Sequence, residues 1–199
     1  MRFILKIILC ALLAVGTGVA YLALRSGDVV YTVHEWMSPA RYQQHDALIR
    51  AVAARNNLDP MLVKAVVWRE SRFDSQKIGS AGERGLMQVT EPAAREWARE
   101  THVENFQPEE LFEPKVNLQA GTWYLARAVQ HWKKQADPVP FALAEYNAGA
   151  SRAQRWAGSD GDLIVPPAEF RSRVDFPGTR RYIDLITARY EFYKARGRM

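Results

Sequence analysis

Apolar residues recur along most of the chain at helical spacing, but at its start they form one continuous block. Residues 7–24 carry no charge and follow a short basic start at Arg2 and Lys6. This pattern is typical of a membrane-spanning helix and also of a signal peptide. Small residues at Gly18 and Ala20 offer a cleavage site, although the length of the block favours an uncleaved anchor. The basic start predicts a cytoplasmic amino end, with the remainder of the chain beyond the inner membrane.

The sequence divides into three parts by pattern. Residues 1–25 form the signal peptide or membrane anchor. Residues 26–41 show no helical pattern and are predicted to be a tether, with a short extended piece at 29–33. Residues 42–199 are expected to form one folded domain.

Within the folded domain the spacing of apolar residues predicts helices and no long strand. The first helix is expected over 45–57, and Asp59 and Pro60 supply a cap and a first-turn proline for the second. This second helix should be buried nearly all round, because only Lys64 interrupts its apolar body. Further helices are predicted over 92–99, 117–134, 141–147, 151–156 and 179–196. The loop 75–85 has room for a minor hairpin, so the fold class is mainly α.

Composition and charge exclude several classes of function. The chain has 199 residues, of which 48% are hydrophobic and 25% charged, which is an ordinary globular composition. Three of the 27 basic residues lie in the first 25 positions and all 22 acidic residues follow, so the remainder carries only +2. Nucleic-acid binding would need a clustered basic surplus. The single cysteine, Cys10, lies in the apolar block, and the four histidines show no paired spacing, so neither a metal nor another cofactor is expected.

One carboxylate, Glu70, stands at the end of the second predicted helix. Apolar surroundings and the negative end of the helix dipole both disfavour its charged form, which raises its pKa. A pKa near neutrality is what a general acid needs. The alternative is a solvated Glu paired with Lys or Arg, and helix placement alone favours that ordinary role.

Three short motifs surround this carboxylate in sequence order. They are Glu70-Ser71, Gly85-Leu86-Met87-Gln88 and Ala144-Glu145-Tyr146-Asn147-Ala148-Gly149. In this order and at this spacing they resemble the catalytic domain of soluble lytic transglycosylases, a lysozyme-like family that acts on peptidoglycan. Residues 117–125 resemble the family's central helix and residues 177–182 its carboxy-terminal segment. The resemblance therefore covers roughly residues 46–193 and implies a lysozyme-like helical domain.

The resemblance implies cleavage of the bond between N-acetylmuramic acid and N-acetylglucosamine without water. Glu70 would protonate the bridging oxygen and then accept the proton of the sugar's 6-hydroxyl, which attacks to leave a 1,6-anhydro ring. The acetamido group of the substrate would replace the second carboxylate of ordinary glycosidases. Tyr146 would lie near Glu70 and donate from its phenol to the reacting sugar. Ser71 would orient the carboxyl or the acetamido group.

The resemblance also implies a set of substrate-binding residues. Met87 and Gln88 would line the cleft, and the Gln88 amide offers both a donor and an acceptor. Asn147 would shape the cleft or its loop, and Tyr182, near Arg180, would form a wall of the groove. Each has an ordinary alternative as a core, capping or turn residue. The expected partners are peptidoglycan strands and the inner membrane, and the expected state is a periplasmic monomer.

The chain departs from the family pattern at Glu83, Glu91 and Gly178. If Glu83, Glu91 or Asp74 held a water on the far side of the sugar, the enzyme would hydrolyse its substrate like a goose-type lysozyme. Two further alternatives are a peptidoglycan-binding envelope protein without turnover and a membrane-proximal interaction protein. The presence of Glu70 argues against a pure binder, because binding gains nothing from a desolvated carboxyl group.

Overall fold

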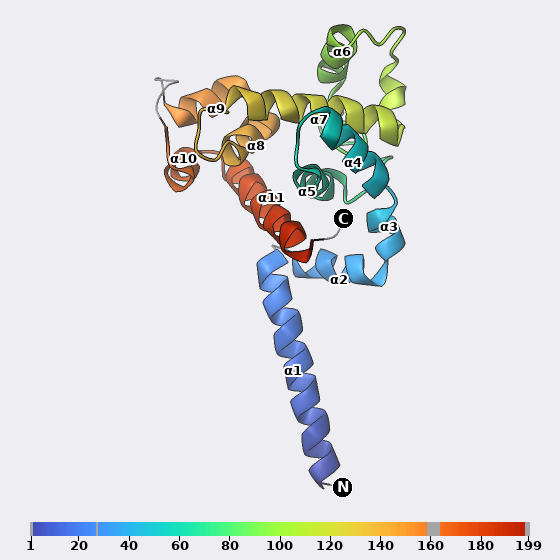
Figure 1. Ribbon diagram of the computed structural model, residues 1–199, viewed down its shortest axis with the longest axis vertical. Coiled ribbons are helices and arrows are strands. Elements are labelled where there is room, and N and C mark those ends of the chain that lie inside the picture. The colour runs from blue at the N-terminus through green and yellow to red at the C-terminus, as the bar shows by residue number, and fades with distance from the viewer. Residues whose placement is uncertain (1, 27, 159–163, 198–199) are drawn as a thin grey trace.

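The computed structural model describes residues 2–26, 28–158 and 164–197, and these are mostly helical (Figure 1). Helix α1 (Arg2–Ser26) projects from a helical domain, and α2 (Val29–Met37) and α3 (Pro39–Gln43) run across the end of the domain nearest to α1. The other elements are α4 (Asp46–Arg55), α5 (Pro60–Ser71), α6 (Glu91–Glu100), η1 (Pro108–Phe112), α7 (Pro114–His131), α8 (Val139–Ala148), α9 (Ala150–Ala157), α10 (Pro167–Arg173) and α11 (Pro177–Arg196). The predicted mainly α fold is confirmed.

Helix α5 forms the centre of the core, as its apolar sequence predicts. Its residues 62–68 are all buried. Lys64 is buried with them, and its ammonium group pairs with the Asp46 carboxylate at 2.7 Å, which meets the need of a buried charge for a partner. The Asp59 side chain caps the helix by accepting the N–H of Met61 at 2.8 Å. Helices α11 and α4 pack against α5, α7 packs against α4, and α8 packs against α7 and α11 (Figure 1).

The predicted helices of the domain are all present, with ends that differ by a few residues. Two short elements, η1 and α10, lie outside the predictions because each is too brief to show a periodic pattern. The predicted hairpin in the loop 75–85 is reduced to isolated bridges, in which Arg84 pairs with Ile78 and with Val89. Apart from these bridges, the described residues contain no β-strand.

The prediction of a tether without helical structure over 26–41 is wrong, because α2 and α3 occupy most of it. Asp28 caps α2 by accepting the N–H of Tyr31 at 3.2 Å. The periodicity is misleading because the face of α2 that meets the domain is mainly polar, with Tyr31 as its one ring packed against the core. Thr32 is buried there, and Glu35 points to the domain through an ion pair with Arg189. An apolar stripe is therefore not what attaches this helix.

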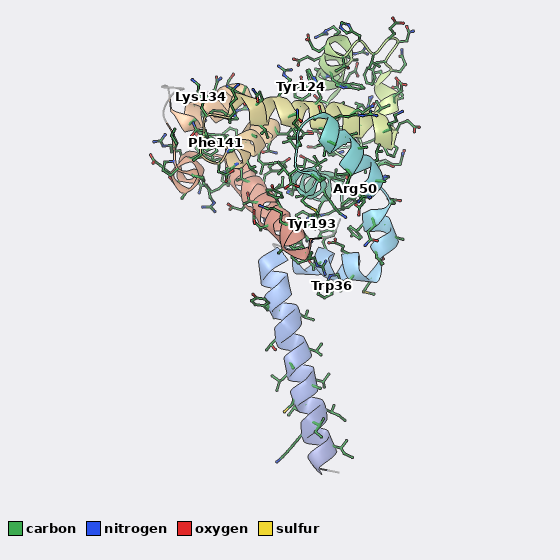
Figure 2. The ribbon with its side chains drawn as sticks, viewed as in Figure 1. Trp36, Arg50, Tyr124, Lys134, Phe141 and Tyr193 are labelled. Atoms are coloured by element: carbon green, nitrogen blue, oxygen red, sulfur yellow. The ribbon has the colours of Figure 1, made fainter. Side chains whose placement is uncertain are left out.

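Helix α1 carries the apolar block predicted from the sequence. Its window Ile4–Tyr21 has a mean hydropathy of 2.1 over 18 residues, which is long and apolar enough to cross a membrane. The large apolar side chains of this window are exposed rather than packed on the domain, as the isolated helix in Figure 2 shows. The helix therefore fits a membrane anchor or a signal segment.

Candidate active site

The Glu70 carboxyl lies in the last turn of α5, where the apolar body of the helix meets the loop 75–85. Burial raises the pKa of Glu70 to about 7, against the lowering effects of a hydrogen bond from Tyr182 and the charges of Arg69 and Lys77. The charge of Glu83 adds to the rise. The raised pKa expected from the helix position is thus present, and desolvation is its main cause.

Tyr182 holds the Glu70 carboxyl from α11. Its side chain is only 2% exposed, and its hydroxyl donates to Oε1 of Glu70 at 2.5 Å. The guanidinium group of Arg69 lies over the Tyr182 ring, 5.6 Å from its centre. The predicted role of Tyr182 as a groove wall is therefore wrong, since the ring is enclosed and its polar end faces the candidate acid.

The loop after α5 folds back over the end of the helix that carries Glu70. The Lys77 ammonium group donates to the backbone carbonyl of Glu70, a favourable position for a cation at a helix carboxyl end. The carbonyl of Lys77 in turn accepts the N–H of Gly85 at 2.8 Å and the side-chain amide of Gln88 at 3.1 Å. These contacts place the Gly85–Gln88 turn beside the candidate acid.

Asn117, on α7, holds the Gly85–Gln88 turn in place by hydrogen bonds. Its side-chain amide donates to the carbonyls of Arg84 at 2.7 Å and Leu111 at 2.8 Å, and its oxygen accepts the N–H of Met87 at 2.8 Å. Asn117 is fully buried, so these bonds satisfy every face of its amide that needs a partner. Gly85 adopts φ +74°, in the left-handed region, and lies directly over this amide.

Met87 and Tyr146 meet inside the domain. The Met87 side chain is fully buried and packs on Gly121 of α7, so the prediction that it lines the cleft is wrong. Its backbone carbonyl accepts the Tyr146 hydroxyl at 2.9 Å. Burial raises the pKa of Tyr146 well above its usual value, and the nearby charge of Glu70 raises it further. Tyr146 therefore lies near Glu70 and keeps its phenolic proton.

Gln88 and Tyr146 also line a pocket of about 340 Å³. Its other walls come from the start of α6, the middle of α7 and the junction of α8 with α9. A volume of this size suits a small ligand or part of a larger one. The structure thus brings two of the predicted site residues to one open concavity and a third, Glu70, close to one of them.

The remaining predicted residues have local partners. The Ser71 hydroxyl donates to the Val67 carbonyl of its own helix at 3.3 Å. The exposed Asn147 accepts the Thr179 hydroxyl at 2.7 Å, which ties the end of α8 to the start of α11. Arg180 donates from Nε and Nη2 to the backbone carbonyl of Val174, at 3.2 and 2.5 Å. Their predicted contacts with substrate stay predictions.

The acidic residues that would support hydrolysis also have partners. Asp74 accepts the N–H of Gln76 at 2.9 Å and Glu83 that of Ala81 at 3.0 Å, so both stabilise turns of the loop. Glu91 pairs with Arg95 at 2.7 Å on the exposed side of α6. Among the described residues, no group of three or more His, Cys, Asp or Glu side chains is arranged to hold a metal ion.

Comparison with known proteins identifies this arrangement. The sequence profile of the family described as Transglycosylase SLT domain matches residues 47–164, more than half of the chain. The chain belongs to this family. The matched range includes Glu70, the Gly85–Gln88 turn, Asn117 and Tyr146, but it ends before α11, which supplies Tyr182.

Individual relatives agree with the SLT assignment. The soluble lytic murein transglycosylase of Salmonella typhimurium is 29% identical over 131 residues, which are 65% of this chain and 20% of that protein. The membrane-bound lytic murein transglycosylase F of Desulfosudis oleivorans is 33% identical over 105 residues, 51% of this chain and 21% of that protein. The chain therefore spans about a fifth of the length of these two relatives.

Solved structures agree on the fold. The 70 kDa soluble lytic transglycosylase of Escherichia coli superposes with a TM-score of 0.69 at 24% identity, over 76% of this chain and 24% of that one. The folded part of the chain is thus an SLT-type, lysozyme-like domain, as the motifs predict. In it, a tyrosine from α11 donates to the carboxyl group of Glu70, and Lys77 links the backbone of Glu70 to the Gly85–Gln88 turn.

Proposed function

We propose that the chain is a peptidoglycan lytic transglycosylase that uses Glu70 as its single acid and base. The observation that carries the proposal is a desolvated carboxyl group whose pKa is raised to about 7, held by Tyr182 and close to Tyr146, which lines an open pocket. Membership of the SLT family and the names of the relatives, which are murein transglycosylases, support the substrate class.

In the first step the Glu70 carboxyl donates its proton to the oxygen that bridges N-acetylmuramic acid and N-acetylglucosamine. The bond from that oxygen to the anomeric carbon breaks, and the substrate's acetamido oxygen stabilises the positive carbon. In the second step the Glu70 carboxylate takes the proton of the 6-hydroxyl, whose oxygen bonds to the anomeric carbon. The pKa near 7 suits both steps, because the same group is available as an acid and then as a base.

The other site residues bind and orient the glycan in this proposal. Tyr146 stays neutral, and its phenol exchanges its bond to the Met87 carbonyl for one to the sugar. Gln88 offers its amide oxygen from the pocket wall, because its NH2 group donates to the carbonyls of Lys77 and Gly85. Met87 contributes through its backbone, which joins Tyr146 to the turn. Ser71, Asn147 and Arg180 shape the surrounding backbone through the contacts given above.

Analysis of products from purified murein sacculi tests the proposal. We expect every newly formed N-acetylmuramic acid end to be a 1,6-anhydro sugar, about 18 mass units below the hydrolysed form as the loss of one water requires. Reducing ends would identify a lysozyme-like hydrolase instead. Binding to sacculi without release of fragments would identify a non-catalytic envelope protein. The partners of Asp74, Glu83 and Glu91 favour the first result, because each of these carboxylates is engaged in its own loop or helix.

We further propose that α1 attaches the enzyme to the inner membrane and leaves the SLT domain in the periplasm, where its substrate lies. The length and hydropathy of Ile4–Tyr21 support this placement. The short basic start supports the cytoplasmic position of the amino end.

Replacing Tyr182 by Phe is expected to shift the pH dependence of catalysis. The Tyr182 hydroxyl favours the charged form of Glu70 and lowers its pKa, so its loss lets the pKa rise further. The alkaline limb of the pH profile, where kcat/KM declines, then moves to higher pH. At pH values below this limb, kcat falls about tenfold because the carboxyl loses its orientation. Both effects are measured as rates on a soluble glycan substrate between roughly pH 5 and 9, a range that brackets the expected pKa of the acid.

A matched control lies on the same helix. The Tyr190 hydroxyl donates to the Asp59 carboxylate at 2.8 Å, at the opposite end of α5 from Glu70. Tyr190→Phe removes the same kind of bond and should leave the alkaline limb where it is. An unchanged limb in Tyr182→Phe would show that the bond to Glu70 does not set the acid's pKa.

A further inference from the structure

Helix α2 presents a polar face to the SLT domain. The fully buried guanidinium of Arg189, on α11, pairs with the Glu35 carboxylate at 2.9 Å and donates to the Thr32 hydroxyl at 3.1 Å. Arg72, just after α5, pairs with Asp28 at 3.3 Å. Charged pairs with this degree of burial hold a helix in one orientation, because breaking one leaves an uncompensated charge inside the protein.

The opposite face of α2 is apolar and exposed. Val30 is 63% exposed and Met37 77%. The two residues are seven positions apart, which places both on one side of the helix, with Val33 between them. The ring of Trp36 flanks this stripe and is 38% exposed. A helix whose polar side faces the protein and whose apolar side faces outward has the reverse of the usual orientation for a helix in water.

The position of α2 indicates what covers the stripe. Only residues 27 and 28 separate α2 from α1, and α1 packs against both α2 and the carboxyl end of α11. In Figure 1, α2 runs across the end of the domain from which α1 departs, and Figure 2 shows Trp36 at this end. The guanidinium of Arg196, exposed at the end of α11, lies 5.6 Å from the centre of the Trp36 ring.

We propose that the Val30–Met37 face of α2 lies on the bilayer into which α1 inserts. The inference rests on the proposed anchoring role of α1 and is independent of the proposed catalytic chemistry. An apolar stripe of this kind enters the boundary between headgroups and acyl chains, where Trp is favoured. An exposed cation beside it, Arg196 at the end of α11, adds attraction to anionic headgroups.

This contact orients the catalytic site relative to the membrane. Arg189, which holds α2, and Tyr182, which holds Glu70, lie on the same helix, two turns apart. Because α11 is continuous between them, a bilayer that fixes α2 also fixes the direction in which the Glu70 site faces. Helix α2 is therefore held rigidly to the domain and does not act as a flexible tether.

The experiment measures the depth of labels in the full chain inserted into vesicles of phosphatidylethanolamine and phosphatidylglycerol. A nitroxide label is attached at Met37→Cys in a Cys10→Ser background, and a control label at Arg99→Cys, which is exposed on α6 at the opposite end of the domain (Figure 1). Relaxation by oxygen, which enriches in lipid, is compared with relaxation by a water-soluble nickel complex. We expect the ratio of oxygen to nickel collisions to be several-fold higher at position 37 than at position 99.

Equal, water-like ratios at both positions in vesicle-bound chain would overturn the proposal and leave the anchor intact. A chain that does not remain with the vesicles would overturn it together with the anchor. Spin coupling between position-37 labels that disappears on dilution with unlabelled chain would identify a second copy as the occupant, and would also contradict it. None of these readings depends on cleavage of peptidoglycan, so they are independent of the test of function.

Discussion

Replacing Glu70 by Gln is expected to reduce the release of fragments from murein sacculi by about a thousandfold, within the range for loss of a general acid. The amide has no proton to give to the bridging oxygen and takes none from the 6-hydroxyl. It nevertheless has almost the same shape and keeps an oxygen that accepts the Tyr182 hydroxyl, whose bond to the acid is 2.5 Å in the native protein. The fold and the binding of sacculi should therefore persist while turnover is lost.

Glu91→Gln is the matched control for this experiment. Glu91 lies just after the Gly85–Gln88 turn but pairs with Arg95 on the exposed side of α6, so its loss should leave turnover unchanged. Near-native turnover in Glu70→Gln would remove Glu70 from the mechanism. A comparable loss in Glu91→Gln would instead point to a second carboxylate and to hydrolysis.

The stability of Glu70→Gln gives a reading of desolvation that is independent of catalysis. The folded pKa of about 7 lies above the ordinary 4.5, so between these values the folded protein binds a proton that the unfolded chain releases. Native stability therefore falls as pH rises from 4.5 to 7, by at most about 3 kcal/mol. The neutral amide escapes this loss. Thermal unfolding should show the variant more stable than the native protein at alkaline pH and about equal in acid, and a variant less stable at alkaline pH would contradict the burial of a charged group.

The sequence was sufficient to predict those features that local pattern determines. The helices of the domain follow from apolar spacing, the start of α5 from Asp59, and the raised pKa of Glu70 from its place at the end of a buried helix. Each depends on residues within a few turns of one another. The same reasoning failed for α2 because its buried face is polar, and Arg189, which satisfies that face, lies 154 residues away from Glu35.

The site was predicted only in part, because several of its contacts also join residues that are distant in sequence. Tyr182 and Glu70 are 112 residues apart, and no pattern in α11 indicates that this side chain turns inward to a carboxyl group. Met87 was expected in the cleft because a motif specifies which residue is present but not which side of a turn its side chain takes. In the structure its backbone meets Tyr146 and its side chain enters the core. The three bonds of Asn117 likewise depend on segments that meet only in the fold.

Replacing Gly85 by Ala is expected to have the largest effect on stability of any single methyl group added near the site. A Cβ at this position would lie 2.3 Å from the Asn117 amide nitrogen and 2.3 Å from the Leu111 carbonyl oxygen, and the φ of +74° disfavours any side chain. The Leu111 backbone is fixed, so the Asn117 amide has to leave its partners. We expect the free energy of unfolding, measured with urea, to fall by about 4 kcal/mol, from lost buried hydrogen bonds and backbone strain together.

Gly82→Ala separates these two causes. Gly82 has a similar φ of +83° in the same loop, but a Cβ there would meet nothing within 4 Å. It should therefore lose only the backbone term of about 1 kcal/mol. Because the Asn117 amide sets the turn that carries Gln88, Gly85→Ala should also lower activity below the unfolding transition, whereas Gly82→Ala should not. Equal losses of stability in the two variants would mean that backbone strain alone explains the effect of Gly85→Ala. The Asn117 contacts would then not be what holds the turn beside Glu70.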